Sequence, residues 1–274
     1  MAEQDIQITP FFMESPRGRL FCLYLAPQAN AIRGGILYLH PFAEEMHKSR
    51  RMAALQARAL AAQGYAVLQI DLTGSGDSAG DFGDASWSAW KADAQLAHQS
   101  LAETINKPIG LWGLRTGGLL ALDISRQLPA VDRLILWQPV TNGDLFLNQF
   151  LRIKLANEML TSKQSKTNTK ELRTSLANGN SVEVAGYRLS PTMARELAQI
   201  QFPALPPPCP VFWLEAGLNK GAQITPASMS IIDAWHDAGA VVHSKALTSD
   251  PFWNTQEITE SPEFIAATLE SFEI

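Results

Sequence analysis

The stretch IGLWGLRTGGLLA, residues 109–121, decides the fold because it joins a short buried strand to a helix through a tight turn. Gly113 and Gly117 stand two residues on either side of Arg115. Glycines at these places let the strand and the helix pack closely around a strained strand-to-helix turn. Such a turn raises its central side chain above the end of a sheet. The pattern therefore predicts that Arg115 stands over a sheet, beside the N-terminus of a helix.

The alternation of buried strand and helix extends on both sides of this turn. Expected strands cover residues 35–40, 66–71, 109–113, 134–138, 210–217 and 241–247, and expected helices cover residues 46–63, 87–103, 117–128, 224–238 and 262–272. Residues 5–14 and 19–26 predict a hairpin, because the four residues between them, SPRG, favour a turn. An antiparallel opening followed by strand–helix units predicts an α/β fold with a mainly parallel eight-stranded sheet and helices on both faces.

The alternation stops at residues 144–202, which hold no comparable buried strand. We therefore expect a core made of residues 1–143 and 203–274, with residues 144–202 inserted as a mostly helical cap. Residues 161–180 are rich in Ser, Thr, Asn and Lys and predict a mobile section of that cap.

Composition limits the class of protein. The chain has 274 residues, of which 46% are hydrophobic and 18% charged, so it can bury a large core and is not disordered as a whole. Its 22 basic and 27 acidic residues give a formal net charge of −5, which offers no general attraction to nucleic acid. We therefore expect no nucleic-acid partner.

The cysteines and histidines exclude several kinds of site. Cys22 and Cys209 form no CxxC pair, which excludes a disulfide framework and favours a reducing, cytoplasmic compartment. The N-terminus does not have the pattern of a signal peptide, and no apolar run reaches the roughly 18 residues that a membrane span needs. The five histidines show no ligand spacing, so no metal is expected, and no cofactor is implied.

The turn around Arg115 is the most informative candidate site, because ligands of such sheets bind beyond the carboxyl ends of the strands. In the motif G-x-S-x-G the central residue is the nucleophile of a serine hydrolase. Arg115 cannot take that role, since a guanidinium stays protonated. A serine hydrolase would place its general base, a histidine, in the loop at residues 248–253. In this chain that loop carries Asp250 and no histidine. In the loop where a serine hydrolase would place the carboxylate that orients its histidine, this chain carries Asn219. Glu215 lies inside the preceding strand and is a poor substitute for that carboxylate.

Two further strand-end loops carry polar residues. The loop HPFAEE, residues 40–45, is placed to give a backbone N–H from Phe42 or Ala43 to an oxyanion, and we expect His40 to orient that loop. Residues 71–78, DLTGSGDS, have glycines for tight turns but lack a phosphate-binding pattern. Asp71 and Ser78 are expected to bond backbone amides there.

The element order, the D-x-x-G-x-G-x-S run at residues 71–78 and the two turn glycines resemble the α/β-hydrolase superfamily over essentially the whole chain. More narrowly, HPFAEEMHKSRR (residues 40–51), GLRTGGLLA (113–121) and PFWNTQEI (251–258) resemble the second type of exosortase-A-system-associated hydrolase. The resemblance implies an α/β-hydrolase fold. It also implies a setting in exopolysaccharide production and PEP-CTERM protein sorting in Gram-negative bacteria.

The first functional hypothesis is a hydrolase-family pocket without serine-triad chemistry that binds an anionic small molecule, a carboxylate or a phosphate. Helix N-termini and arginine both favour such groups. The candidate ligand-binding residues are Arg115, Thr116, His40, Phe42, Ala43, Glu44 and Asp71. An arginine at the floor of a crevice costs several kcal/mol unless it is paired, so an internal partner is also expected. The candidate partners are Asp250, Glu44, Glu45 and Asp71.

The second hypothesis is an active hydrolase with an unconventional set of residues. Its nucleophile would be Ser75 or Ser78, its base His40 or His47, and its acid Asp250 or Glu44.

The third hypothesis is a scaffold that binds a protein partner through the cap. Phe252, Trp253, Trp87 and Trp90 would then form a partner surface, although core packing is the commoner role of large aromatic residues. The basic residues Lys48, Arg50 and Arg51 fit either a solvated helix start or the mouth of the pocket.

Overall fold

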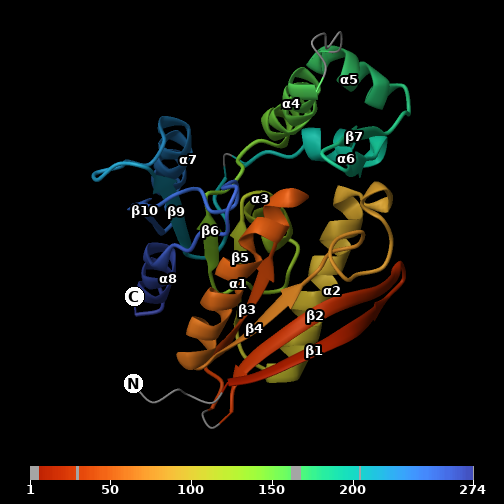
Figure 1. The fold of residues 1–274 in the computed structure, drawn as a ribbon. Helices are drawn as coiled ribbons and strands as arrows, with labels where there is room; N and C mark the ends of the chain where they lie inside the picture. Colours follow the sequence, from red (N-terminus) through yellow and green to blue (C-terminus); the bar gives the residue numbers. More distant parts are fainter. Residues whose placement is uncertain (1–5, 29–30, 162–167, 204, 274) are drawn as a thin grey trace.

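Eight strands form one sheet in the computed structural model, which describes residues 6–28, 31–161, 168–203 and 205–273. They are β1 (Ile6–Ser15), β2 (Gly18–Pro27), β3 (Gly34–Leu39), β4 (Tyr65–Ile70), β5 (Ile109–Leu114), β6 (Leu134–Trp137), β9 (Val211–Gly217) and β10 (Val242–Thr248). Their order is β1-β2-β4-β3-β5-β6-β9-β10 (Figure 1). Strands β1 and β2 pair antiparallel, β2 pairs antiparallel with β4, and the remaining pairs are parallel. The predicted mainly parallel eight-stranded sheet is confirmed.

The central strands are buried on both faces. Every residue of β3, β5 and β6 is buried, which explains why these segments are continuous apolar runs without alternation. Strand β1 lies at the edge of the sheet, and its partly buried and exposed residues largely alternate, as expected for a strand with one wet face.

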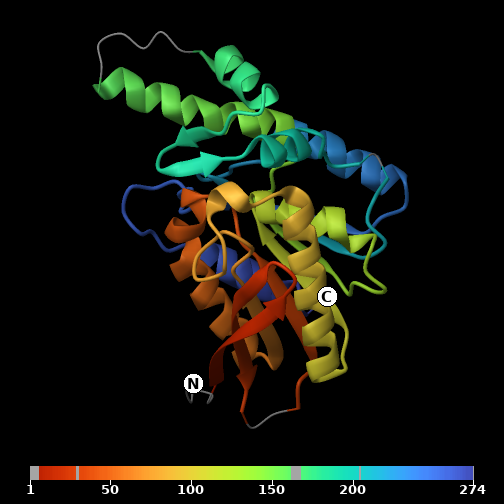
Figure 2. The ribbon, with the colours of Figure 1, turned by 90° about the vertical axis from the view of Figure 1, so that its right-hand side faces the viewer.

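Five helices cover the two faces of the sheet. Helices α1 (Glu44–Ala62) and α8 (Pro262–Glu270) pack on one face, where Met52 and Phe264 share a buried cluster with Trp137. Helices α2 (Trp87–Ile105), α3 (Thr116–Ser125) and α7 (Pro226–Asp237) pack on the other face, where their apolar sides form a second cluster. The two layers of helices are visible in Figure 2, which turns the molecule by 90°. The expected helices on both faces are thereby confirmed.

A separate group of elements lies between β6 and β9 in the sequence. It contains α4 (Gly143–Thr161), α5 (Thr169–Ala177), β7 (Val182–Val184), β8 (Tyr187–Leu189) and α6 (Pro191–Ala198), which we call the cap. Figures 1 and 2 show the cap together at one end of the molecule. Its helix α4 brings Phe146 and Phe150 edge-on against Phe42, which follows β3, so the cap lies over the carboxyl ends of the central strands.

The cap differs from the expectation in two respects. Strands β7 and β8 form a two-stranded hairpin that the sequence did not predict, because three-residue strands carry too little periodic pattern. Part of the stretch expected to be mobile forms helix α5. Asn168 caps the N-terminus of this helix, because its side chain accepts a hydrogen bond from Glu171 N–H. Leu172 and Leu176 of the helix are buried. Residues 162–167 of that stretch lie outside the described residues.

Candidate functional site

The turn between β5 and α3 is built by two close approaches of the backbone. A Cβ atom on Gly113 would lie 2.3 Å from the carbonyl oxygen of Gly117, and one on Gly117 would lie 2.0 Å from the carbonyl oxygen of Leu39. Both contacts are shorter than any side chain allows, so both positions require glycine. The residue between them, Arg115, has φ 55° and ψ −118°.

Hydrogen bonds hold the backbone of Arg115 in this conformation. Its N–H donates to the carbonyl oxygen of Trp137 at 2.9 Å, and its own carbonyl oxygen accepts from Gly118 N–H and Val140 N–H. Two more non-glycine residues with positive φ lie nearby, Ala43 (φ 53°) at the start of α1 and Gln138 (φ 41°) after β6. Such conformations persist where the surrounding structure fixes them, and they are commonest at functional sites.

The side chain of Arg115 is held from three directions. Its Nε donates to Oε1 of Glu45 at 3.2 Å, and its Nη1 makes a longer contact of 3.4 Å with the carbonyl oxygen of Gln138. Its guanidinium carbon lies 5.6 Å from the centre of the Trp253 ring. Of the four carboxylates considered as internal partners, the structure therefore pairs Arg115 with Glu45, whose helix α1 begins beside the turn.

Within this ion pair, the described residues give the Glu45 carboxylate only part of the hydrogen bonding that its charged form needs. Burial raises the pKa of its carboxyl group, and the nearby charges of Arg115 and Lys48 oppose that rise. Its Oε2 atom is buried and has no hydrogen-bond partner among the described residues. The pair thus keeps one carboxylate oxygen without a donor, next to a guanidinium that uses only two of its five N–H groups within the described part of the chain.

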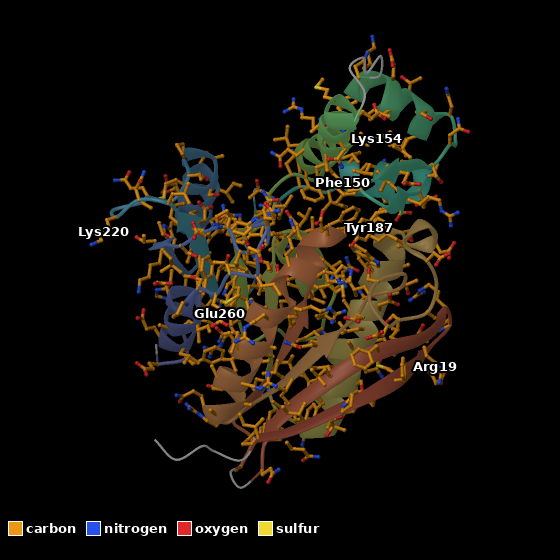
Figure 3. The ribbon with its side chains drawn as sticks, viewed as in Figure 1. Arg19, Phe150, Lys154, Tyr187, Lys220 and Glu260 are labelled. Carbon is orange, nitrogen blue, oxygen red and sulfur yellow. The ribbon has the colours of Figure 1, made fainter. Side chains whose placement is uncertain are left out.

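A cavity of about 250 Å³ opens over the Arg115–Glu45 pair. Aromatic side chains from both the core and the cap form much of its wall, and Figure 3 shows two of them, Phe150 and Tyr187, at the junction of these parts. The lining residues are Phe42, Glu44, Glu45, Lys48, Arg115, Phe146, Gln149, Phe150, Ile153, Ala185, Tyr187, Trp253 and Asn254. Among these described residues there is no serine, threonine, cysteine or histidine.

The structure brings only some of the predicted residues to this cavity. Arg115, Phe42 and Glu44 line it, and so does Lys48, whose Nζ lies 3.4 Å from Oε1 of Glu44. The other predicted residues, Thr116, His40, Ala43 and Asp71, are buried but are not among the lining residues.

His40 holds the loop between β3 and α1 by two hydrogen bonds. Its Nε2 accepts from Leu72 N–H at 3.2 Å, which assigns the ring proton to Nδ1, and Nδ1 donates to the carbonyl oxygen of Pro41 at 2.7 Å. Burial lowers the pKa of His40. The imidazole is therefore neutral and fully engaged with backbone.

The burial of His40 gives a prediction for stability against pH. An unfolded histidine takes up a proton near pH 6.5, whereas the folded His40, with its lowered pKa, does not. The free energy of unfolding should therefore fall as the pH drops below 6.5, by up to about 1.4 kcal/mol per pH unit for this group. Urea denaturation of wild type and His40→Gln between pH 5 and 7.5 should show a shallower slope in the variant.

A second histidine contributes in the same direction, since burial also lowers the pKa of His98. The variant His98→Gln should remove that separate part of the slope. A slope that stays the same in both variants would contradict the assignment.

The two serines proposed as nucleophiles of an unconventional hydrolase lie in the loop at residues 71–78, where side chains hydrogen-bond to backbone groups and stabilise the loop itself. Asp71 accepts from Nη2 of Arg50 at 2.8 Å and from Asp77 N–H at 3.0 Å. The Ser78 hydroxyl donates to the carbonyl oxygen of Asp71 and accepts from Phe21 N–H at 2.8 Å. Ser75 is buried and, like Ser78, is not among the lining residues.

The two residues at the expected acid and base positions of a serine triad, Asn219 and Asp250, also lie apart from the cavity wall. Asn219 and Asp250 are exposed, and neither is a lining residue. Glu215 is buried within β9, where it accepts from Trp213 Nε1 and from Thr225 N–H, both at 2.9 Å. His47 is exposed on α1.

The aromatic residues divide between core and cavity. Trp87 and Trp90 are core residues whose ring nitrogens donate to Asp123 and to the carbonyl oxygen of Thr73, and Phe252 is fully buried. Trp253 lines the cavity. Sequence reasoning also missed Phe146 and Phe150 as wall residues, although their i, i+4 spacing on α4 marks one apolar helix face.

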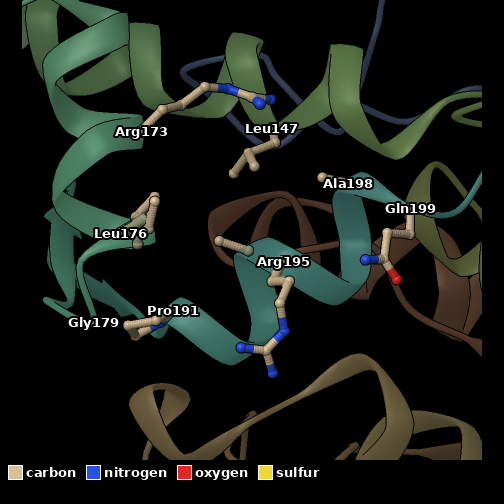
Figure 4. A pocket seen from close by; sticks show the side chains of 10 residues that line it. Leu147, Arg173, Leu176, Gly179, Pro191, Arg195, Ala198 and Gln199 are labelled. Atoms are coloured by element: carbon tan, nitrogen blue, oxygen red, sulfur yellow. The ribbon is translucent and has the colours of Figure 1, made fainter.

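A larger cavity, of about 440 Å³, lies within the cap (Figure 4). Helices α4, α5 and α6 line it, with Leu147 and Leu176 on its apolar side. Arg173 at its edge is held by Asp144 at 2.6 Å. None of the predicted site residues lines this cavity.

The described part of the chain holds neither a metal-binding cluster nor a membrane-spanning helix. No group of three or more His, Cys, Asp and Glu side chains there is arranged to hold a metal ion. No helix in the same part of the chain combines the length and the apolar character that crossing a bilayer requires.

Comparison with known proteins assigns the family. The family model described as serine aminopeptidase, S33, matches residues 30–203, which is more than half of the chain. The chain belongs to the serine aminopeptidase S33 family. Its matched region includes the Arg115 turn and all the elements of the cap. A comparison with curated proteins finds no match.

Solved structures agree with this S33 family chain in fold. Est1E from Butyrivibrio proteoclasticus with bound ferulic acid has a TM-score of 0.71 at 16% identity, covering 96% of this chain and 98% of that chain. A carboxyl esterase from Bacillus coagulans gives 0.58 at 16% identity, covering 88% and 89%. A monoglyceride lipase from Saccharomyces cerevisiae gives 0.59 at 13% identity, covering 93% and 94%. The chain therefore has the α/β-hydrolase fold.

Proposed function

We propose that this chain binds a small anionic molecule in the cavity over Arg115 and does not hydrolyse it. The observation that carries the proposal is the residue at the tip of the turn. Arg115 occupies the place from which a serine would attack, and no hydroxyl, thiol or imidazole group of Ser, Thr, Cys or His belongs to the described cavity lining. Acyl transfer by a serine triad needs nucleophile, base and acid together, so a catalytically degenerate member of the family is the function best supported.

The chemistry of Arg115 supports an anion as the ligand. The guanidinium keeps its charge at all physiological pH values and donates in a planar fork that matches a carboxylate or a phosphate. Its Nε and Nη1 already have partners, and further N–H groups remain for a ligand. The rest of the wall is largely aromatic, so the ligand is expected to carry an apolar body behind its anionic group.

We also propose a cellular role for this binding function, and this part of the proposal rests on sequence resemblance and not on the geometry of the cavity. The segments at residues 40–51, 113–121 and 251–258 that resemble the exosortase-associated family support a role beside exopolysaccharide production. Each of these three segments contributes at least one residue to the cavity lining, namely Phe42, Arg115 and Trp253.

The absence of hydrolysis is directly testable with p-nitrophenyl acetate. Wild type is expected to release p-nitrophenol no faster than buffer does, and Arg115→Ser is expected to gain nothing, because no imidazole lines the described cavity to activate the new hydroxyl. Ferulate and inorganic phosphate, titrated into wild type, are the probes of binding. Ester hydrolysis by wild type that disappears in Ser75→Ala would contradict the proposal and favour the unconventional hydrolase.

A further inference from the structure

We propose that the cavity over Arg115 takes an aromatic monocarboxylic acid and that Glu45 accepts one proton from solvent as the ligand's carboxylate binds to Arg115. This inference rests on the proposed function, whose ligand it defines more narrowly and whose binding it makes dependent on pH.

The wall of the cavity favours a flat ring. Phe42 meets Phe146 and Phe150 edge-on, with ring centres 5.6 Å and 5.1 Å apart. Trp253 and Tyr187 add two more aromatic surfaces to the lining. Aromatic rings prefer such edge-on or offset contacts with one another, and a volume of about 250 Å³ accommodates a single substituted ring.

The charges around the cavity sum to zero before any ligand enters. Arg115 is paired with Glu45 at 3.2 Å and Lys48 with Glu44 at 3.4 Å, so each cation already has its anion. A carboxylate bound to the remaining N–H groups of Arg115 would share one guanidinium with the Glu45 carboxylate. Two carboxylates in one site do not both stay ionised without cost, and the pKa of one of them rises strongly.

Glu45 is the group that takes the proton, because its surroundings already disfavour its charged form. Its Oε2 is buried without a partner among the described residues, whereas the Glu44 side chain is 54% exposed and keeps its hydration. Burial has raised the pKa of Glu45, and only Arg115 and Lys48 oppose this.

Among the described residues that line the cavity, the other elements around Glu45 add no group that competes for the proton. Helix α4 contributes Phe146, Gln149, Phe150 and Ile153, and the loop after β10 contributes Trp253 and Asn254, none of which titrates. Strand β8 contributes Tyr187, and burial raises the pKa of that phenol, so it stays neutral. A phosphate dianion would bring a second negative charge that one proton does not offset, which favours a monocarboxylate.

Calorimetric titration of the full chain with benzoate, in two buffers of different ionisation enthalpy, counts the protons exchanged. In titrations between pH 5 and 9, wild type is expected to take up protons, approaching one per benzoate at pH values between the pKa of Glu45 in the free chain and its higher pKa in the complex, with affinity falling about tenfold per pH unit across that interval. Glu45→Gln is expected to bind benzoate without proton uptake and more tightly than wild type at pH 8. Glu103→Gln, an exposed substitution on α2, is the matched control and should behave as wild type.

Two measurements keep the inference falsifiable if Glu45→Gln folds poorly. Benzamide has the same ring without the charge and should bind wild type with no proton exchange. The carboxyl carbon of bound ¹³C-labelled benzoate should keep the chemical shift of the ionised form, because the proton resides on Glu45.

The possible failures are distinguishable. Benzoate binding that depends on Arg115 but exchanges no protons overturns this inference and leaves the proposed function intact. Proton uptake that persists in Glu45→Gln, or that vanishes in Glu44→Gln instead, assigns the proton elsewhere and also overturns it. Failure of benzoate, ferulate and phosphate alike to bind through Arg115 overturns both.

Discussion

Replacement of Gly117 by alanine is expected to lower the free energy of unfolding by at least about 4 kcal/mol, because the added Cβ has no room and no flexible neighbour. It would lie 2.0 Å from the carbonyl oxygen of Leu39 and 2.8 Å from that of His40. Both atoms belong to the backbone at the end of β3, in the middle of the sheet, so relief requires the strand and helix α3 to separate. Urea denaturation followed by circular dichroism measures the loss.

The adjacent glycine provides the matched control. A Cβ on Gly118 would lie 3.1 Å from the side-chain Cβ of Pro139 and 3.4 Å or more from other atoms, a tight contact that small shifts relieve. Alanine also gains about 1 kcal/mol of helix propensity over glycine in α3. Gly118→Ala is therefore expected to stay within about 1 kcal/mol of wild type, and an equal loss in both variants would show that the close approach at Gly117 is not the cause.

Replacement of Arg115 by alanine is expected to weaken benzoate binding at pH 6 at least about thirtyfold. A hydrogen-bonded ionic contact contributes about 2 kcal/mol, and each 1.4 kcal/mol is a factor of ten in affinity. The variant also removes the cation that counteracts the raised pKa of Glu45, so the site loses its positive charge and no other group in the described lining replaces the guanidinium fork. Calorimetric titration of the folded variant, checked by circular dichroism, gives the ratio of dissociation constants.

Three further variants separate this effect from a general loss of charge. Arg195→Ala removes an exposed arginine beside the separate cap cavity and should leave benzoate binding as in wild type. Arg115→Lys keeps the charge but loses the planar fork, so it should bind with intermediate affinity. The double variant Arg115→Ala/Glu45→Ala should recover part of the stability that Arg115→Ala loses, since it removes the unpaired carboxylate. Equal affinities in wild type and Arg115→Ala would exclude Arg115 as the anion-binding group.

The sheet and its helices were predictable because their patterns are long and periodic. Buried parallel strands such as β3 and β5 are continuous apolar runs, and α2 carries a full amphipathic pattern. Boundaries were less exact: α1 begins at Glu44 instead of Met46, and α3 ends at Ser125 instead of Leu128. Caps and last turns depend on single hydrogen bonds, which periodicity does not record.

The candidate site was predictable only in its central residue. The spacing of two glycines placed Arg115 at the tip of the turn, because that spacing encodes a local backbone shape. Its partner Glu45 is seventy positions away, and four carboxylates fitted equally well until the twist of the sheet fixed which helix began beside the turn. Asp71 was expected as the last residue of a strand, whereas β4 ends at Ile70 and the Asp71 side chain accepts hydrogen bonds from Arg50 and Asp77 N–H. Choices of rotamer within a loop leave no pattern in the sequence.

The positive φ angles of Ala43 and Arg115 have a consequence for protein engineering. A non-glycine residue in such a conformation costs roughly 1 kcal/mol or more, which glycine relieves. Laboratory selection for heat resistance alone would find an easy gain at Ala43, which lies between the cavity-lining residues Phe42 and Glu44, whereas at Arg115 the loss of the ion pair with Glu45 opposes it. Selection for thermal stability alone would therefore substitute a residue beside the proposed binding cavity at an early stage, unless each round also selects for ligand binding.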